Sequence, residues 1–128
     1  MRDEKLLETL TQMWGVAGFE KEVREFIARE TAPWADETIT DAMGNLIVLK
    51  KGKGGPKSKK IMFAAHMDEI GFMVKTIEAD GRLRVCNLGW NWTGSAYNSR
   101  VRFRNGVNGV VSCVGPIEEA GNKAGKLY

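Results

Sequence analysis

In the stretch FAAHMDEIGFMV, residues 63–74, the sequence pattern changes from mixed helix and strand to alternating β-strands. It overlaps an apolar run, IMFAA at 61–65, which has no polar residue and therefore fits a strand buried on both faces. His66, the only histidine of the chain, follows this run directly, and Asp68 comes two residues later. We expect 61–65 to be a central strand of an α/β sheet, with His66 and Asp68 at its carboxyl end.

The residues before this strand predict two helices and a hairpin. Apolar residues at helical spacing predict a first helix near 3–14, and EKEVREFIARE at 20–30 predicts a second amphipathic helix. ETIT at 37–40 and LIVLK at 46–50 have the length of strands and flank the turn sequence DAMGN. The amino-terminal half therefore mixes helices with β-structure.

The residues after the quoted stretch predict antiparallel strands. Apolar and polar residues alternate over 70–76, 83–86 and 100–104, which is the pattern of strands with one solvated face. An Asp-Gly pair in ADGR at 79–82 and an Asn-Gly pair at 105–106 predict tight turns between such strands. The carboxyl-terminal half is therefore expected to be all β.

Composition limits the class of protein. The chain has 128 residues, 43% of them hydrophobic, and a net charge of +3, which suits one ordinary globular domain. It contains neither a signal-peptide pattern nor an apolar run near the roughly 20 residues of a membrane span, so we expect a cytoplasmic protein. The lysines cluster at 50–60, in a sequence typical of an exposed loop, and Cys86 and Cys113 are expected to be free thiols.

His66 and Asp68 could form part of a metal site. In an extended strand, residues two apart face the same way, so the Asp68 carboxylate could accept a hydrogen bond from one ring nitrogen while the other binds a cation. A zinc site needs three or four ligands, and the spacing does not select among Asp36, Asp41, Glu69 and the two thiols for the others. A lone histidine in an ordinary environment is the alternative.

Four segments resemble one protein family. In order and spacing they are similar to the amino-terminal part of the M42 family of metallo-aminopeptidases, also known as glutamyl or deblocking aminopeptidases, TET-type peptidases or endoglucanase M. The resemblance covers nearly the whole chain. The segments are WGVAGFEKEVREFI at 14–27, DAMGNLIVLKKG at 41–52, KIMFAAHMDEIGFMVKTI at 60–77 and NSRVRFRNGVNGVV at 98–111.

The resemblance implies a two-part organisation. In the family, a zinc-peptidase-type α/β domain is interrupted after its His-x-Asp strand by a smaller antiparallel β-barrel-like domain that serves oligomer assembly. Residues 1–68 are then expected to be the amino-terminal part of the peptidase domain, and residues 69–128 part of the inserted domain. The intact protein is expected to be a homo-oligomer built from dimers, up to a dodecamer, with peptides as substrates and no nucleic-acid or membrane partner.

The resemblance also implies roles for the two site residues. His66 is expected to be a ligand of a site for two divalent metal ions, zinc or cobalt, and Asp68 the catalytic carboxylate that orients it. Family members are considerably longer, and their other ligands and general-base glutamate follow the inserted domain. The chain is therefore expected to be an amino-terminal fragment that is inactive alone. It departs from the family pattern in NLGWNWTGSAYNSRV at 87–101, which has fewer glycines, and in VGPIEEAG at 114–121.

Two other functions remain open from the residues alone. The chain could be a small β-rich module that binds single-stranded nucleic acid, with arginines on phosphates and aromatic rings as stacking platforms. It could also be a structural module in which the loop GWNWTGSAY, 89–97, contacts other subunits, although the tryptophans could equally fill a core. The residues concerned are Arg82, Arg84, Arg100, Arg102, Arg104, Trp90, Trp92 and Tyr97.

Overall fold

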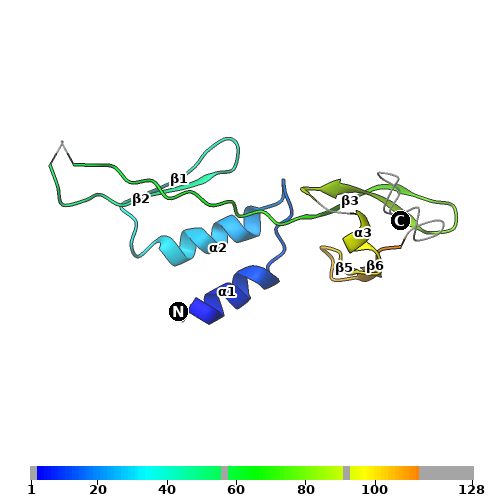
Figure 1. Cartoon of the computed structure of the whole chain (residues 1–128). Helices are drawn as coiled ribbons and strands as arrows, with labels where there is room; N and C mark the ends of the chain where they lie inside the picture. The colour runs from blue at the N-terminus through cyan, green and yellow to red at the C-terminus, as the bar shows by residue number, and fades with distance from the viewer. Residues whose placement is uncertain (1–2, 56–57, 91–92, 113–128) are drawn as a thin grey trace. The chain divides into compact units, whose positions relative to one another are not determined.

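The structure, a computed structural model, describes residues 3–55, 58–90 and 93–112 (Figure 1). The chain divides into two compact units, Met1–Asp68 and Glu69–Tyr128, each of which is considered separately below. Counting only the residues just given, the first unit contains two helices and a hairpin, and the second contains two hairpins and one short helix. Among the described residues, no helix is long and apolar enough to span a membrane.

Two helices open the first unit, as predicted. Helix α1 (Asp3–Gln12) carries Asp3 and Glu4 in its first turn, where carboxylates interact favourably with the helix dipole. Helix α2 (Lys21–Thr31) ends as Ala32 donates its backbone N–H to the carbonyl of Ala28, shortly before Pro33. The amphipathic pattern of the sequence is therefore a reliable guide to both helices.

The predicted hairpin is present in the first unit. Strands β1 (Glu37–Thr40) and β2 (Leu46–Leu49) pair antiparallel, with Glu37 opposite Leu49 and Thr40 opposite Leu46. Asp41 closes the turn, because its Oδ1 accepts the backbone N–H groups of Met43 and Asn45, both at 2.9 Å. A further hydrogen bond from the Asn45 side-chain amide is the main reason why the pKa of Asp41 lies below its usual range.

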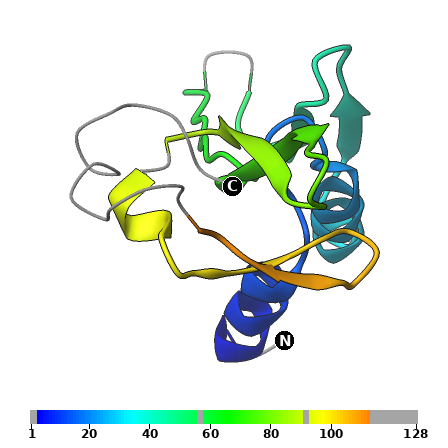
Figure 2. The same cartoon turned by 90° about the vertical axis from the view of Figure 1, so that its right-hand side faces the viewer.

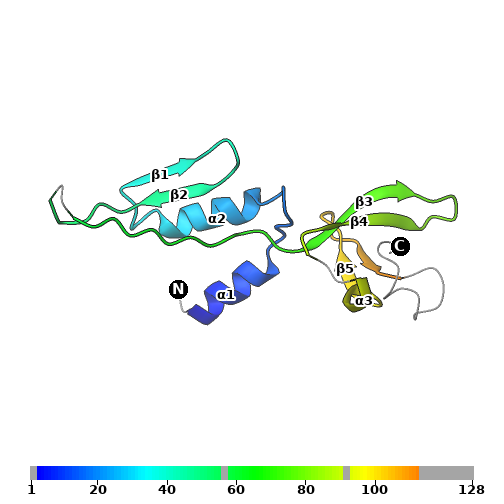
Figure 3. The same cartoon turned by 45° about the horizontal axis from the view of Figure 1, so that its top comes forward.

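Helix α2 supports this hairpin, as Figure 3 shows. Arg24 on the helix donates from Nη1 to the carbonyl oxygen of Gly44 at 3.1 Å. Val23, one residue earlier, is buried together with Val16. Gly15 lies so close to Val23 that a Cβ atom there would sit 2.6 Å from its Cγ2, so the position requires glycine. The core of the first unit is therefore small and centred on Val23.

The predicted central strand at 61–65 is wrong for this structure. Among the described residues these five belong to no sheet, and Ile61, Met62 and Phe63 are 79%, 87% and 94% exposed. The described strands instead form three separate two-stranded sheets, β1–β2, β3–β4 and β5–β6. An apolar run shows that a segment prefers burial, but a strand also needs neighbours for its backbone groups, and the described residues provide none.

The second unit begins with a long hairpin. Strands β3 (Gly71–Ile77) and β4 (Leu83–Leu88) pair antiparallel, and their register shifts between Val74 and Thr76. The predicted Asp-Gly turn joins them, with Gly81 at a φ of 85°. The expected alternation of burial is not seen in β3, because Met73 and Val74 are both exposed.

A second hairpin follows a short helix in this unit (Figure 2). Helix α3 (Thr93–Ala96) precedes β5 (Arg100–Arg102), which pairs antiparallel with β6 (Asn108–Val110) through the predicted Asn-Gly turn. Among the described residues of the unit, Val111 is the buried hydrophobic one, and its backbone bonds to Asn98 and to Ser99. Trp90 is 84% exposed, so of the two alternatives left open for this residue, the filling of a core is not seen.

The fold class is a mixture of helices and sheet, and the finer prediction of a barrel-like second domain goes beyond what this architecture shows. Cys86 is a free cysteine, as predicted. Cys113, Trp92 and the segment 114–128 lie outside the described residues.

Gly44 gives a direct test of the hairpin turn. Its φ of 87° lies in the left-handed region, so Gly44→Ala should lower the local stability of β1–β2 by about 1 kcal/mol. Hydrogen exchange of the hairpin amides would measure this loss. Gly55→Ala is the matched control, because that glycine has no positive φ and open space around it. Equal exchange in the two variants would contradict the strain at Gly44.

Candidate functional site

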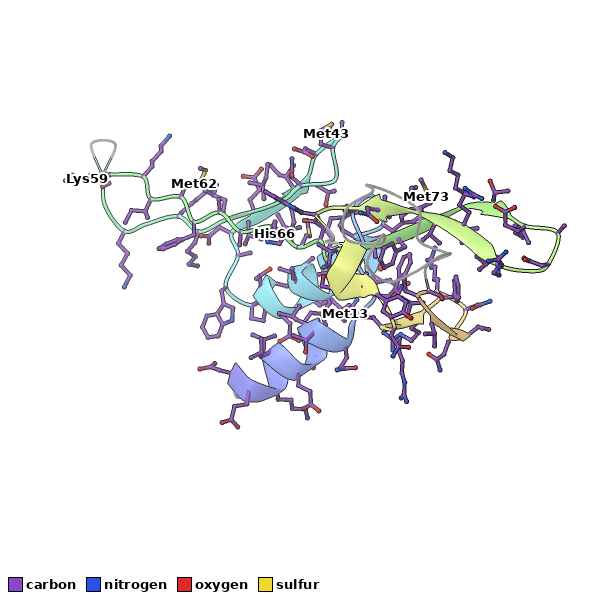
Figure 4. The ribbon with its side chains drawn as sticks, turned by 45° about the vertical axis from the view of Figure 1, so that its right-hand side comes forward. Met13, Met43, Lys59, Met62, His66 and Met73 are labelled. Carbon is purple, nitrogen blue, oxygen red and sulfur yellow. The ribbon has the colours of Figure 1, made fainter. Side chains whose placement is uncertain are left out.

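His66 and Asp68 are in contact within the first unit. The His66 side chain, labelled in Figure 4, is 84% exposed. Its Nδ1 atom lies 3.1 Å from Oδ1 of Asp68. The same Nδ1 atom lies 3.0 Å from the backbone carbonyl oxygen of Asp68. The sequence spacing predicted the first contact, whereas the carbonyl contact depends on the backbone path and has no signature in the sequence.

The two contacts determine which ring nitrogen carries the proton in neutral His66. An ionised carboxylate and a carbonyl oxygen are both acceptors only, so Nδ1 must be the donor. The neutral ring then keeps a lone pair on Nε2, and the exposure of the side chain leaves that edge open. A histidine whose other nitrogen bonds to a carboxylate is the usual form of a metal ligand in proteins.

The other candidate ligands do not gather around His66. Among the residues that the structure describes, no group of three or more His, Cys, Asp and Glu side chains could hold a metal ion. Asp36 instead pairs with Lys50 at 3.3 Å and accepts the backbone N–H of Lys51, which is the main cause of its lowered pKa. The Asp41 carboxylate accepts hydrogen bonds within its own turn. The Cys86 sulfur lies 3.6 Å from the carbonyl oxygen of Met73. The described side chains thus supply a single oriented imidazole, fewer ligands than a zinc site requires.

Two of the arginines expected to contact phosphates form ion pairs within the second unit. Arg82 pairs with Asp80 at 2.6 Å, and Arg84 pairs with Glu78 at 2.7 Å. These pairs join residues of one hairpin and offset the positive charge that nucleic-acid binding would need. The structure therefore does not favour the nucleic-acid alternative.

Comparison with known proteins gives one consistent family. The model of the family described as M42 glutamyl aminopeptidase matches residues 44–125. The matched range includes both His66 and Asp68. A putative aminopeptidase of Acetivibrio thermocellus is 44% identical over 124 residues, which cover 96% of this chain and 36% of that protein. This chain therefore spans about a third of the length of that relative.

Solved structures agree with this result. A TET aminopeptidase from the marine sediment archaeon Thaumarchaeota archaeon SCGC AB-539-E09 has a TM-score of 0.79 and 30% identity, covering 97% of this chain and 37% of that one. The TET1 peptidase of Pyrococcus horikoshii has a TM-score of 0.70 and 35% identity, covering 88% of this chain and 34% of that one. That protein is described as assembling into a tetrahedron or a large octahedral shell.

The position of the proton on His66 can be measured. Because Nδ1 faces two acceptors, we expect the neutral ring to carry its proton on Nδ1, as seen in long-range ¹⁵N–¹H correlation spectra at a pH where the ring is neutral. Asp68→Ala should reduce the Nδ1-protonated population, whereas Asp36→Ala should leave it unchanged. A ring protonated mainly on Nε2 in the unaltered chain would contradict the geometry.

Proposed function

The chain belongs to the M42 glutamyl aminopeptidase family, and from this membership we propose that it is the amino-terminal part of a peptidase that removes amino-terminal residues from peptides. The observation that carries the proposal is the contact of His66 with Asp68, which orients an exposed imidazole inside the segment matched by the family. Peptides are the proposed substrates. The residues that select the amino-terminal side chain of the peptide are proposed to lie outside this chain.

We propose that His66 is one ligand of a site for two divalent metal ions, zinc or cobalt, and that Asp68 is the catalytic carboxylate that positions this ligand. Such ions supply Lewis acidity and lower the pKa of a bound water molecule. Asp68 holds the His66 proton on Nδ1 and so keeps the lone pair on Nε2 available. The further ligands must come from outside the described residues, because these offer no cluster of three.

The proposed domain organisation assigns residues 1–68 to the peptidase domain and residues 69–128 to an inserted β domain with a barrel-like form. Two observations support it. The chain divides into units after Asp68, and the described strands of the second unit pair only as antiparallel hairpins. The inserted domain would serve assembly into homo-oligomers built from dimers, as large as a dodecamer. The shells formed by the Pyrococcus horikoshii protein support this part of the proposal. The proposed location is the cytoplasm.

The role of Asp68 can be tested in the longer protein. Asp68→Asn keeps the size of the side chain but removes its charge, so metal affinity or peptide turnover should fall roughly 10–100-fold while the fold is retained. Asp80→Asn is the matched control, because Asp80 lies in the other unit and pairs with Arg82. Release of amino-terminal residues from short peptides would give the rates. Wild-type kinetics in Asp68→Asn would remove Asp68 from the mechanism.

Metal binding by the 128-residue chain can be tested separately. We expect little zinc or cobalt to remain bound after excess ion is removed, and no release of amino acids from peptides, because one imidazole makes a weak site. Elemental analysis would count the ions per chain, with His66→Ala as the control. One or more tightly held ions that are lost in His66→Ala would show that the chain completes a site from its own residues.

A further inference from the structure

The loop that joins α1 to α2 passes beside the segment that carries His66 and Asp68, as Figure 1 and Figure 3 show. The loop approaches with Gly15, and the nearest atom of the segment is the carbonyl oxygen of Met67. A Cβ atom on Gly15 would lie 3.8 Å from that oxygen, which is ordinary van der Waals contact. Met67 and Asp68 are half-buried, whereas His66 is exposed. The loop therefore supports the backbone between His66 and Asp68.

Three local interactions fix the shape of this loop. The rings of Trp14 and Phe19 meet edge to face, with their centroids 5.8 Å apart. The backbone N–H of Phe19 donates to the carbonyl oxygen of Val16 at 2.8 Å. The backbone N–H of Gly18, a residue with a φ of 88°, donates to Oε1 of Glu20 at 2.6 Å. Because Glu20 directly precedes α2, the loop is also tied to the start of that helix.

Gly15 also lies against the buried core of the first unit. Val23 of α2 is 6% exposed, and a Cβ atom on Gly15 would lie only 2.6 Å from its Cγ2 atom. A valine in a helix has one strongly preferred rotamer, so this methyl group cannot turn away freely. A single backbone position thus contacts both the core side of α2 and the peptide unit next to His66.

We infer that the loop at 14–20 fixes the backbone path at Met67, and that Gly15 is a positioning residue for His66. The Nδ1 atom of His66 has two acceptors, both from Asp68, namely Oδ1 at 3.1 Å and the backbone carbonyl oxygen at 3.0 Å. The carbonyl can face Nδ1 only while the peptide units on either side of Met67 keep their orientation. Contact with Gly15 restricts that orientation and so favours the ring with its proton on Nδ1.

The metal-ligand role of His66 is the proposed function on which this inference rests, but the test needs neither a metal ion nor a peptide. The readout is the ratio of Nδ1-protonated to Nε2-protonated neutral rings in the metal-free chain, from long-range ¹⁵N–¹H correlation spectra. A failure of the peptidase proposal would appear as absent turnover in the longer protein and would leave this ratio unaffected. A failure of the present inference would appear in the ratio itself.

Gly15→Ala tests the path from the core to His66. The added Cβ must move roughly 1 Å from Val23 to reach an ordinary contact distance, so the loop and its contact with Met67 shift too. We expect the ratio to fall roughly threefold, as for one weakened hydrogen bond. The double variant with Val23→Ala lacks the crowding methyl group and should recover most of the ratio. Gly55→Ala is the control, because that glycine of the same unit has open space around it.

Val23→Ala alone separates positioning from stability. Loss of a buried side chain should destabilise the first unit without placing an extra atom beside Met67. The ratio should therefore change less than in Gly15→Ala. Circular dichroism would show that the helices persist in each variant. An unchanged ratio in folded Gly15→Ala, or an equal fall in Val23→Ala, would overturn the inference.

Phe19→Ala tests the loop without adding an atom to the core. Phe19 is 48% exposed, so the fold should be retained while the loop loses its ring contact with Trp14. The ratio should then fall by about twofold. Phe63→Ala is the matched control, because Phe63 is 94% exposed and makes no ring contact with the described residues, although it is closer to His66 in sequence. Equal ratios in these two variants would overturn the role of the loop, even if Gly15→Ala does not fold.

Discussion

The need of a β-strand for a neighbour is the constraint on which this structure depends. Each described sheet has two strands, and each pair is joined by a turn of a few residues with a glycine at positive φ, namely Gly44, Gly81 or Gly106. These strands meet their neighbours through local chain reversal. The segment 61–65 has no comparable turn to bring it a partner, so its apolar side chains stay exposed despite a composition suited to burial.

The contact between His66 and Asp68 does not share this dependence. The two residues are close in sequence, and an extended backbone alone brings the carboxylate to Nδ1. The proton on the ring can therefore be positioned before any sheet is completed around it. A metal site has a different requirement, because its ligands must converge from several elements. The carboxylate that orients His66 is close to it in sequence, whereas a complete metal site depends on ligands from distant segments.

The same distinction explains how much could be predicted from the sequence. Both long helices, the three hairpins and their glycine turns follow from patterns within a few residues, and so does the contact of Asp68 with His66. The exposure of 61–65 and of Trp90 could not be predicted, because the burial of an apolar side chain depends on surfaces that distant elements provide. The pairing of Arg84 with Glu78 depends on the register of the hairpin, and the sequence alone also allowed Arg84 to contact a phosphate.

The apolar run 61–65 shows what a completed sheet would add to the described residues. A strand with apolar residues on both faces can be fully buried only between two layers, and one added strand covers an edge but no face. In a longer peptidase, neighbouring strands and helices would cover edges and faces together and bury more apolar surface. Ile61 and Phe63 should therefore lose their exposure wherever those strands and helices are present.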